Sequence, residues 1–292
     1  MEHLDSLYSM AQQQIHWFPG HMSKALREIE EKIKMVDVVI ELLDARAPLS
    51  SINEQLENII KNKKSLVVLT KPDLADSTQT NRWKEELSKR YDSILVLDLT
   101  KGSASDQIAK GVNALGKEKW EKQIARGMKP QPIKAMIIGI PNVGKSSLIN
   151  RLAKRKAAGV QNKPGYTRGE QWIKVSNQFI LLDTPGILPM NYENHEKAAK
   201  LALIGSIREE ILPFDDLFEI LTKFLKERYP NALKGRFDIE EISDNPEEIK
   251  EQIADRRKLL NARGELDCDR ATTLLLKEFK DGLLGPMTLE WL

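Results

Sequence analysis

The sequence has a single cysteine among its 292 residues, and this scarcity removes several possibilities. The thiol of Cys268 can form neither an intramolecular disulfide nor a metal site with a second thiol. This cysteine usage is typical of a reducing compartment, and we expect the protein in the cytoplasm.

Long apolar runs are also missing. No stretch approaches the roughly 20 apolar residues that a membrane-spanning helix needs. The first residues, MEHLDSLYSMAQQQ, include acidic groups and no arginine, so they indicate neither a signal peptide nor a transit peptide. We therefore expect no membrane association.

An excess of charge of one sign is absent overall, since 45 Lys and Arg residues balance 43 Asp and Glu residues. The distribution is uneven, however. Between residues 139 and 176 every charged side chain except Glu170 is basic. Such a local field attracts phosphate groups.

Short apolar runs rich in β-branched residues alternate with helical patterns in the first two thirds of the chain. Nearly continuous runs of this kind are typical of strands buried on both faces of a parallel sheet. The alternation predicts a doubly wound α/β fold with a mostly parallel sheet. The runs are VDVVIELLD, SLVVLT, SILVLDL and AMIIGI, with QWIKVS and QFILLD completing the sheet.

After about residue 205 the strand signal fades and helical patterns follow. Residues 245–264 open with an Asx residue, a proline and two glutamates and close with a glycine, as expected of a helix, and residues 269–282 repeat this pattern. At roughly 150 residues per domain, the length allows two domains. We predict an α/β domain over 1–204, including an extension over 1–14, and an all-α domain over 205–292.

The stretch GIPNVGKSS, from Gly139, has the G-x-x-x-x-G-K-[ST] spacing between a predicted strand and a predicted helix. Glycines there let backbone N–H groups surround phosphates at a helix N-terminus. Lys145 would reach the β- and γ-phosphates, and the Ser146 hydroxyl would bind Mg²⁺. The predicted nucleotide contacts in this loop are Asn142, Val143, Gly144, Lys145, Ser146 and Ser147.

Two later motifs complete the predicted phosphate and metal site. Thr167, in NKPGYTRGE, can bring a hydroxyl and a carbonyl to Mg²⁺ and the γ-phosphate. In DTPG, Asp183 would bind Mg²⁺ and the N–H of Gly186 would sense the γ-phosphate.

The stretch TKPD, from Thr70, predicts the base preference. The Asp73 carboxylate can accept hydrogen bonds from N1–H and the exocyclic amine of guanine, whereas adenine has no donor at N1. Lys71 can lie along the base and along the phosphate-binding loop that starts at Gly139, the P-loop. Asparagine is usual at position 70, so Thr70 is expected to weaken the pocket without changing its preference. Thr100 and Lys101, in LTKG, would close the pocket.

The order of these motifs is unusual, because the base-reading residues near 70 and 100 precede the P-loop at 139. We therefore predict a circularly permuted P-loop GTPase domain, a rewiring that is tolerated when the old termini lie close together. In this order, the chain after DTPG leads toward the C-terminal domain. Nucleotide state could then be transmitted there directly.

The residue after DTPG is Ile187, where Ras-type GTPases have a glutamine that orients the attacking water. An aliphatic side chain cannot orient water. The source of the catalytic group therefore has to be found elsewhere in the chain.

The motif order, together with HWFPGHMSKA near the start and ARGELDCDRATTLLLKEFKDGLLGPMTLEW at the end, resembles the circularly permuted ribosome biogenesis GTPase A (YlqF) family. The resemblance covers nearly the whole chain after about residue 15. Departures are Thr70, His16 in place of the more usual glutamine, and the residues before it.

The resemblance implies a GTPase that acts late in assembly of the large ribosomal subunit, binds its ribosomal RNA and is stimulated by the subunit. It also implies that His21, in the PGHM motif, replaces the missing glutamine, and that Asn142 binds K⁺. Away from the ribosome we expect a monomer.

Other functions remain open at the level of the sequence. His21 could instead cap the following helix or contact RNA, and Asn142 could simply be a turn residue. The chain could be a GTP-dependent RNA-binding module in which hydrolysis is incidental. It could also be an ATP-using RNA or repair enzyme, which Thr70 favours and Asp73 opposes.

Overall fold

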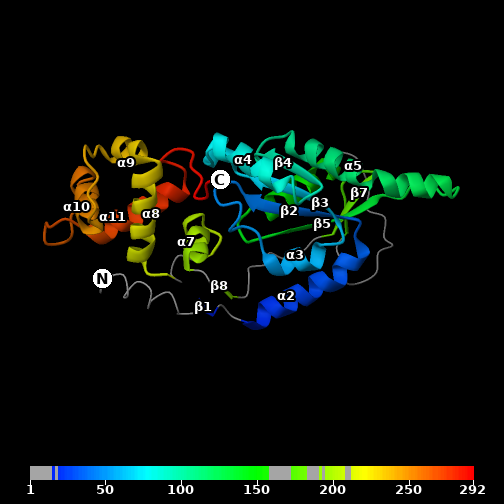
Figure 1. Ribbon diagram of the computed structural model, residues 1–292, viewed down its shortest axis with the longest axis horizontal. Helices are drawn as coiled ribbons and strands as arrows, with labels where there is room; N and C mark the ends of the chain where they lie inside the picture. The colour runs from blue at the N-terminus through cyan, green and yellow to red at the C-terminus, as the bar shows by residue number, and fades with distance from the viewer. Residues whose placement is uncertain (1–14, 17–18, 158–171, 183–190, 193–194, 208–211) are drawn as a thin grey trace.

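The computed structural model describes residues 15–16, 19–157, 172–182, 191–192, 195–207 and 212–292. Its centre is a six-stranded sheet with the strand order β4-β3-β2-β5-β7-β6 (Figure 1). All neighbouring strands are parallel except β6, which runs antiparallel to β7. The strands are β2 (Val38–Asp44), β3 (Lys64–Thr70), β4 (Ser93–Leu97), β5 (Ile133–Gly139), β6 (Trp172–Lys174) and β7 (Phe179–Leu182). The predicted α/β sheet is confirmed.

Helices cover both faces of this sheet because its central strands are apolar on both sides. Alternate residues of β2 show the division, since Ile40 packs in a cluster with α5 and α6 whereas Val39 packs with α2 and α3. Trp83 of α4 packs on the outer strands of the second face. The helices are α2 (Pro19–Lys32), α3 (Glu54–Ile60), α4 (Ser77–Leu87), α5 (Ala104–Ala125) and α6 (Lys145–Ala157), with 3-10 turns η1 (Ile33–Met35) and η2 (Pro72–Leu74).

The C-terminal part of the chain is helical, as predicted. Figure 1 shows α8 to α11 gathered at one end of the molecule, with α7 between them and the sheet. Helix α7 packs on both α8 and α11. The elements are α7 (His195–Leu203), α8 (Phe214–Arg228), α9 (Pro230–Phe237), α10 (Pro246–Arg256) and α11 (Cys268–Lys280). The domain boundary at 204/205 stays a prediction.

The first of the two predicted C-terminal helices is shorter than its sequence pattern suggested. Helix α10 begins as predicted, with the Asn245 side chain accepting from the N–H of Glu247, but it ends at Arg256 rather than near Gly264. Lys258 adopts a positive φ of 53°, and the N–H of Leu259 bonds back to the Ala254 carbonyl. This is a Schellman-type helix end built without glycine.

The last residues of the chain return to the sheet. The N–H groups of Met287 and Leu289 donate to the carbonyls of Leu74 (3.0 Å) and Arg46 (2.7 Å). The buried carboxylate of Glu290 accepts from the N–H of Leu49 at 2.6 Å. The C-terminus is thereby fixed to loops at the carboxyl ends of β2 and β3.

A short second sheet involves the N-terminal segment. Strand β1 (Ile15–His16) pairs antiparallel with β8 (Asn191–Tyr192). Ile15 and His16, which precede α2 in the sequence, therefore lie beside Asn191 and Tyr192, which come after the DTPG motif. Among the described residues, no helix is long and apolar enough to cross a membrane.

Candidate functional site at the carboxyl ends of the strands

The P-loop joins the end of β5 to the start of α6, and two of its glycines have conformations that other residues rarely adopt. Gly139 has φ +149°, and a Cβ there would lie 2.7 Å from the Leu42 carbonyl oxygen. Gly144 has φ +110°, and a Cβ there would lie 2.8 Å from Cδ1 of Leu99. The loop therefore packs closely on β2 and on the loop after β4.

Lys145 is the first residue of α6, and its side chain turns into the loop. Its ammonium group donates to the carbonyls of Gly139 (2.9 Å) and Ile140 (2.6 Å). Burial lowers the pKa of Lys145 to about 8. A phosphate brought to this loop would meet a desolvated cation together with a helix N-terminus, a combination that favours anion binding.

Thr70 connects the base-reading loop to the P-loop. Its fully buried hydroxyl lies 2.9 Å from the carbonyl oxygen of Val143 and 3.1 Å from that of Leu43. The expectation that threonine weakens the pocket stays untested, but the geometry gives this hydroxyl a structural task. It holds the loop after β3 against the residue that precedes Gly144.

Lys71 makes a contact that the sequence did not predict. It has a positive φ of 53°, and its ammonium lies 2.8 Å from Oδ2 of Asp44, at the end of β2. Asp73 follows in η2 and is exposed, as a carboxylate that meets a base must be. Asp44 was missed, although an acidic residue at the carboxyl end of a buried parallel strand is a recognisable signal.

The loop after β4 lies against the P-loop from the other side. Asp98 accepts hydrogen bonds from the N–H and the hydroxyl of Thr100, and it forms an ion pair with Lys101 at 3.7 Å. The Arg151 guanidinium of α6 donates to the carbonyl of Thr100. The structure thus brings the predicted pocket-closing residues to the same edge as the P-loop.

Asn142 has a positive φ of 57°, and its Nδ2 donates to the carbonyl of Gly205 at 2.7 Å. This hydrogen bond uses a donor of the amide and none of the lone pairs of its Oδ1. Ser146 and Ser147 are exposed at the N-terminus of α6, so the Ser146 hydroxyl can reach a metal ion.

Of the remaining predicted site residues, the structure describes only the backbone of His21. Thr167, Asp183, Gly186 and Ile187 lie outside the described residues. The backbone of His21 is described, and it lies in the first turn of α2, which begins at Pro19. His21 therefore does not precede the helix as a capping residue would.

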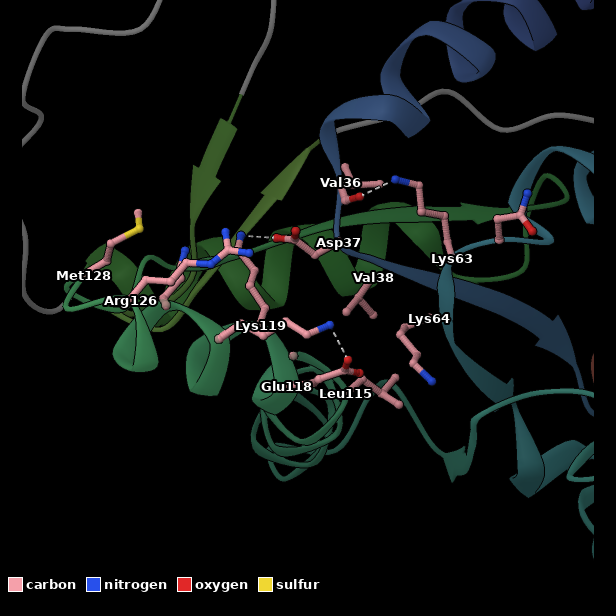
Figure 2. Close-up of a pocket in the computed structure, with 14 residues that line it drawn as sticks. Val36, Asp37, Val38, Lys63, Lys64, Leu115, Glu118, Lys119, Arg126 and Met128 are labelled. Atoms are coloured by element: carbon pink, nitrogen blue, oxygen red, sulfur yellow. Dashed lines mark hydrogen bonds and ion pairs between the residues drawn. The ribbon is translucent and has the colours of Figure 1, made fainter.

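A separate cavity of about 520 Å³ lies at the opposite edge of the sheet, beside the start of β2 (Figure 2). Two of the cations that line it interact with other lining residues. Lys119 pairs with Asp37 at 2.7 Å, and the ammonium of Lys63 donates to the Val36 carbonyl at 2.8 Å. Among the described residues, none from the nucleotide-binding motifs lines this cavity.

Comparison with known proteins identifies the family. The protein is 42% identical to "Ribosome biogenesis GTPase A" of Bacillus licheniformis over 94% of this chain and 98% of the relative. The relative of the same name from Thermotoga maritima is 31% identical, over 94% and 93% of the two chains. The chain belongs to the ribosome biogenesis GTPase A family.

Solved structures agree with this assignment. The chain is similar to GNP-bound YlqF from T. maritima, with a TM-score of 0.63 and 27% identity over 92% of this chain and 98% of that one. The GDP-bound structure of the same protein gives a TM-score of 0.64. The chain is thus assigned to the P-loop GTPases of ribosome biogenesis.

A family model described as "50S ribosome-binding GTPase" matches residues 134–255. The match begins at β5 and leaves the base-reading loops near residues 70 and 100 outside it. This is the result expected when the base-reading part of a GTPase domain has moved ahead of its P-loop.

Magnesium accompanies the nucleotide in GTPases of this family. The exposed Ser146 hydroxyl at the helix start fits a Mg²⁺ ligand, because Mg²⁺ prefers oxygen ligands and is shared with nucleotide phosphates. When bound, the ion neutralises charge on the β- and γ-phosphates.

Proposed function

We propose that this GTPase acts late in maturation of the large ribosomal subunit, that it binds ribosomal RNA of the subunit, and that the subunit stimulates its hydrolysis of GTP. The observation that carries the proposal is the similarity to ribosome biogenesis GTPases A along 94% of the chain, which includes the C-terminal helices as well as the nucleotide site. The proposal includes action in the cytoplasm and a monomeric protein away from the ribosome.

GTP turnover with and without purified bacterial large subunits tests this function. We expect strong stimulation in K⁺ buffer. Small ribosomal subunits are the matched control, because they present RNA of the same charge in a different arrangement. GTP-dependent binding to the large subunit without stimulation would instead support an RNA-binding module in which hydrolysis is incidental.

In the proposed site, Asp73 reads guanine, Ser146, Thr167 and Asp183 hold Mg²⁺, and the N–H of Gly186 senses the γ-phosphate. Asp183 and Gly186 precede α7 in the sequence. Loss of the γ-phosphate would therefore change the packing of the C-terminal helices through this part of the chain. Hydrogen exchange of α8 to α11 should therefore differ between GTP and GDP. Equal protection in the two states would contradict this route.

We also propose that His21 positions the attacking water, in place of the glutamine that Ras-type GTPases have at the position of Ile187. Pairing of β1 with β8 supports the proposal, because it places Ile15 and His16, shortly before His21 in the sequence, beside Asn191 and Tyr192, which come shortly after Gly186. A neutral imidazole can accept a hydrogen bond from water. His21→Ala should lower turnover with little change in GTP affinity. Reduced affinity at unchanged turnover would assign His21 to binding instead.

Asn142 is proposed to bind K⁺ through its Oδ1. The hydrogen bond from Nδ2 to Gly205 supports this role, because it fixes the amide orientation. GTP turnover should be faster in K⁺ than in Na⁺ buffer at equal ionic strength, and equal rates would exclude the proposal.

A further inference from the structure

The guanidinium group of Arg46 joins three parts of the molecule that are distant in the sequence. Arg46 lies two residues beyond β2 and is 2% exposed. Its Nε and Nη2 donate to the two oxygens of Asp44, at 3.0 and 2.9 Å. Nη2 also donates to the carbonyl of Ile204 at 2.9 Å, and Nη1 donates to that of Lys280 at 3.1 Å.

The carboxylate of Asp44 is shared between Arg46 and the base-reading loop. Asp44 is fully buried, and its Oδ2 accepts both from Arg46 and from the ammonium of Lys71. Burial alone would raise the pKa of Asp44, but the hydrogen bonds and charge of Arg46, followed by those of Lys71, hold it below its ordinary value. An ionised Asp44 therefore fixes the position of both cations.

The two carbonyls that Arg46 contacts belong to the ends of two helices. Ile204 follows α7 and Lys280 is the last residue of α11, so the cation meets the negative ends of both helix dipoles. Asn142 of the P-loop bonds to the next carbonyl, that of Gly205. A Cβ at Gly205 would lie 3.0 Å from Cδ of Lys280, so the turn after α7 and the end of α11 are in close contact.

We propose that Arg46 is a positioning residue that couples guanine binding at Lys71 and Asp73 to the seating of α7 and α11. A base that orders the loop after β3 also fixes Lys71, and through Asp44 it fixes the guanidinium that holds both helix ends. Because coupling is reciprocal, firmly seated helices favour guanine binding to the same degree. The planar fork of arginine can serve a carboxylate and two carbonyls at once, whereas a lysine ammonium cannot reproduce that geometry.

Hydrogen exchange of the whole protein, measured with and without GDP, tests the coupling. GDP is chosen because it lacks the γ-phosphate that Gly186 is proposed to sense, and no ribosome is present. A negative result in this experiment would therefore contradict the coupling through Arg46 without contradicting the proposed ribosomal function. We expect GDP to increase protection of α7, α8 and α11 in the natural protein.

In Arg46→Gln this increase should be mostly lost, and the Kd for GDP should rise by about fivefold or more, the lower end of typical coupling between sites. Arg46→Lys, which keeps the charge, should show a smaller loss and serves if the glutamine variant does not fold. The matched control is Arg236→Gln, because Arg236 forms a similar two-point pair with Glu278 inside the helical region, at 2.8 Å for both contacts. This control should lower protection equally with and without GDP.

Two results would overturn the proposal. One is an unchanged GDP-induced increase in protection in both Arg46 variants. The other is lower protection in both nucleotide states with the difference between them preserved, because a purely structural residue behaves in that way.

Discussion

Replacing Thr70 by valine tests whether its hydroxyl is the tie between the base-reading loop and the P-loop. The two side chains are nearly equal in volume, so Thr70→Val removes the hydroxyl without opening a cavity. The lost group is a buried donor shared between the carbonyls of Val143 and Leu43. Loss of such a buried hydrogen bond costs about 1–3 kcal/mol, because the acceptor carbonyls stay buried.

The same change should weaken nucleotide binding, since the P-loop must then be ordered by the nucleotide itself. If the whole of this loss, about 1–3 kcal/mol, came from binding, the affinity for GDP would fall by about 5- to 150-fold. We expect a value within this limit. Urea unfolding gives the free energy of unfolding, and calorimetric titration with GDP gives the Kd.

Thr70→Ser provides the matched control, because it keeps the hydroxyl and removes one methyl group, worth about 0.8 kcal/mol. The serine variant should be destabilised while binding GDP almost as the natural protein does. The reasoning is refuted if the valine variant binds GDP normally, or if the serine variant binds less tightly than the valine variant.

Two further predictions concern buried titratable groups. Burial, and then the charge of Glu57, raises the pKa of Glu41 to about 8. The stability that the neutral Glu41 contributes is therefore fully present below the unfolded pKa near 4.5, and it is lost as pH rises toward 8. Glu41→Gln should therefore flatten the fall in unfolding free energy between pH 5 and pH 8, as measured by urea unfolding; an unchanged slope would show that Glu41 is ionised in the folded protein. Burial lowers the pKa of Lys145 to about 8, and bound phosphate would raise it again, so GDP binding near pH 8.5 should take up protons and GDP affinity should decline above pH 8. Titration calorimetry in two buffers of different ionisation enthalpy measures this uptake, and equal heats in both would contradict it.

The sequence alone was enough to place the P-loop and the loops that follow β3 and β4 on the fold. Strand-like runs such as SLVVLT form parallel strands because they are apolar on both faces, and that property is local. The P-loop spacing at Gly139 and Gly144 is also local, because the φ values of these two residues, +149° and +110°, strongly favour glycine. The start of α10 was predictable for the same reason, as its capping residue acts within one turn.

Tertiary structure decided what those local signals could not. The partners of Thr70 lie 27 and 73 residues away in the sequence, so its function as a tie between loops is not visible in TKPD itself. Arg46 is equally uninformative in sequence, because the carbonyls that it binds are 158 and 234 residues distant. Even the end of α10 depended on Lys258 adopting a conformation that its residue type disfavours. Periodicity and spacing report interactions within a few residues, whereas the contacts that join this nucleotide site to the C-terminal helices form only when parallel strands bring their carboxyl ends to one edge.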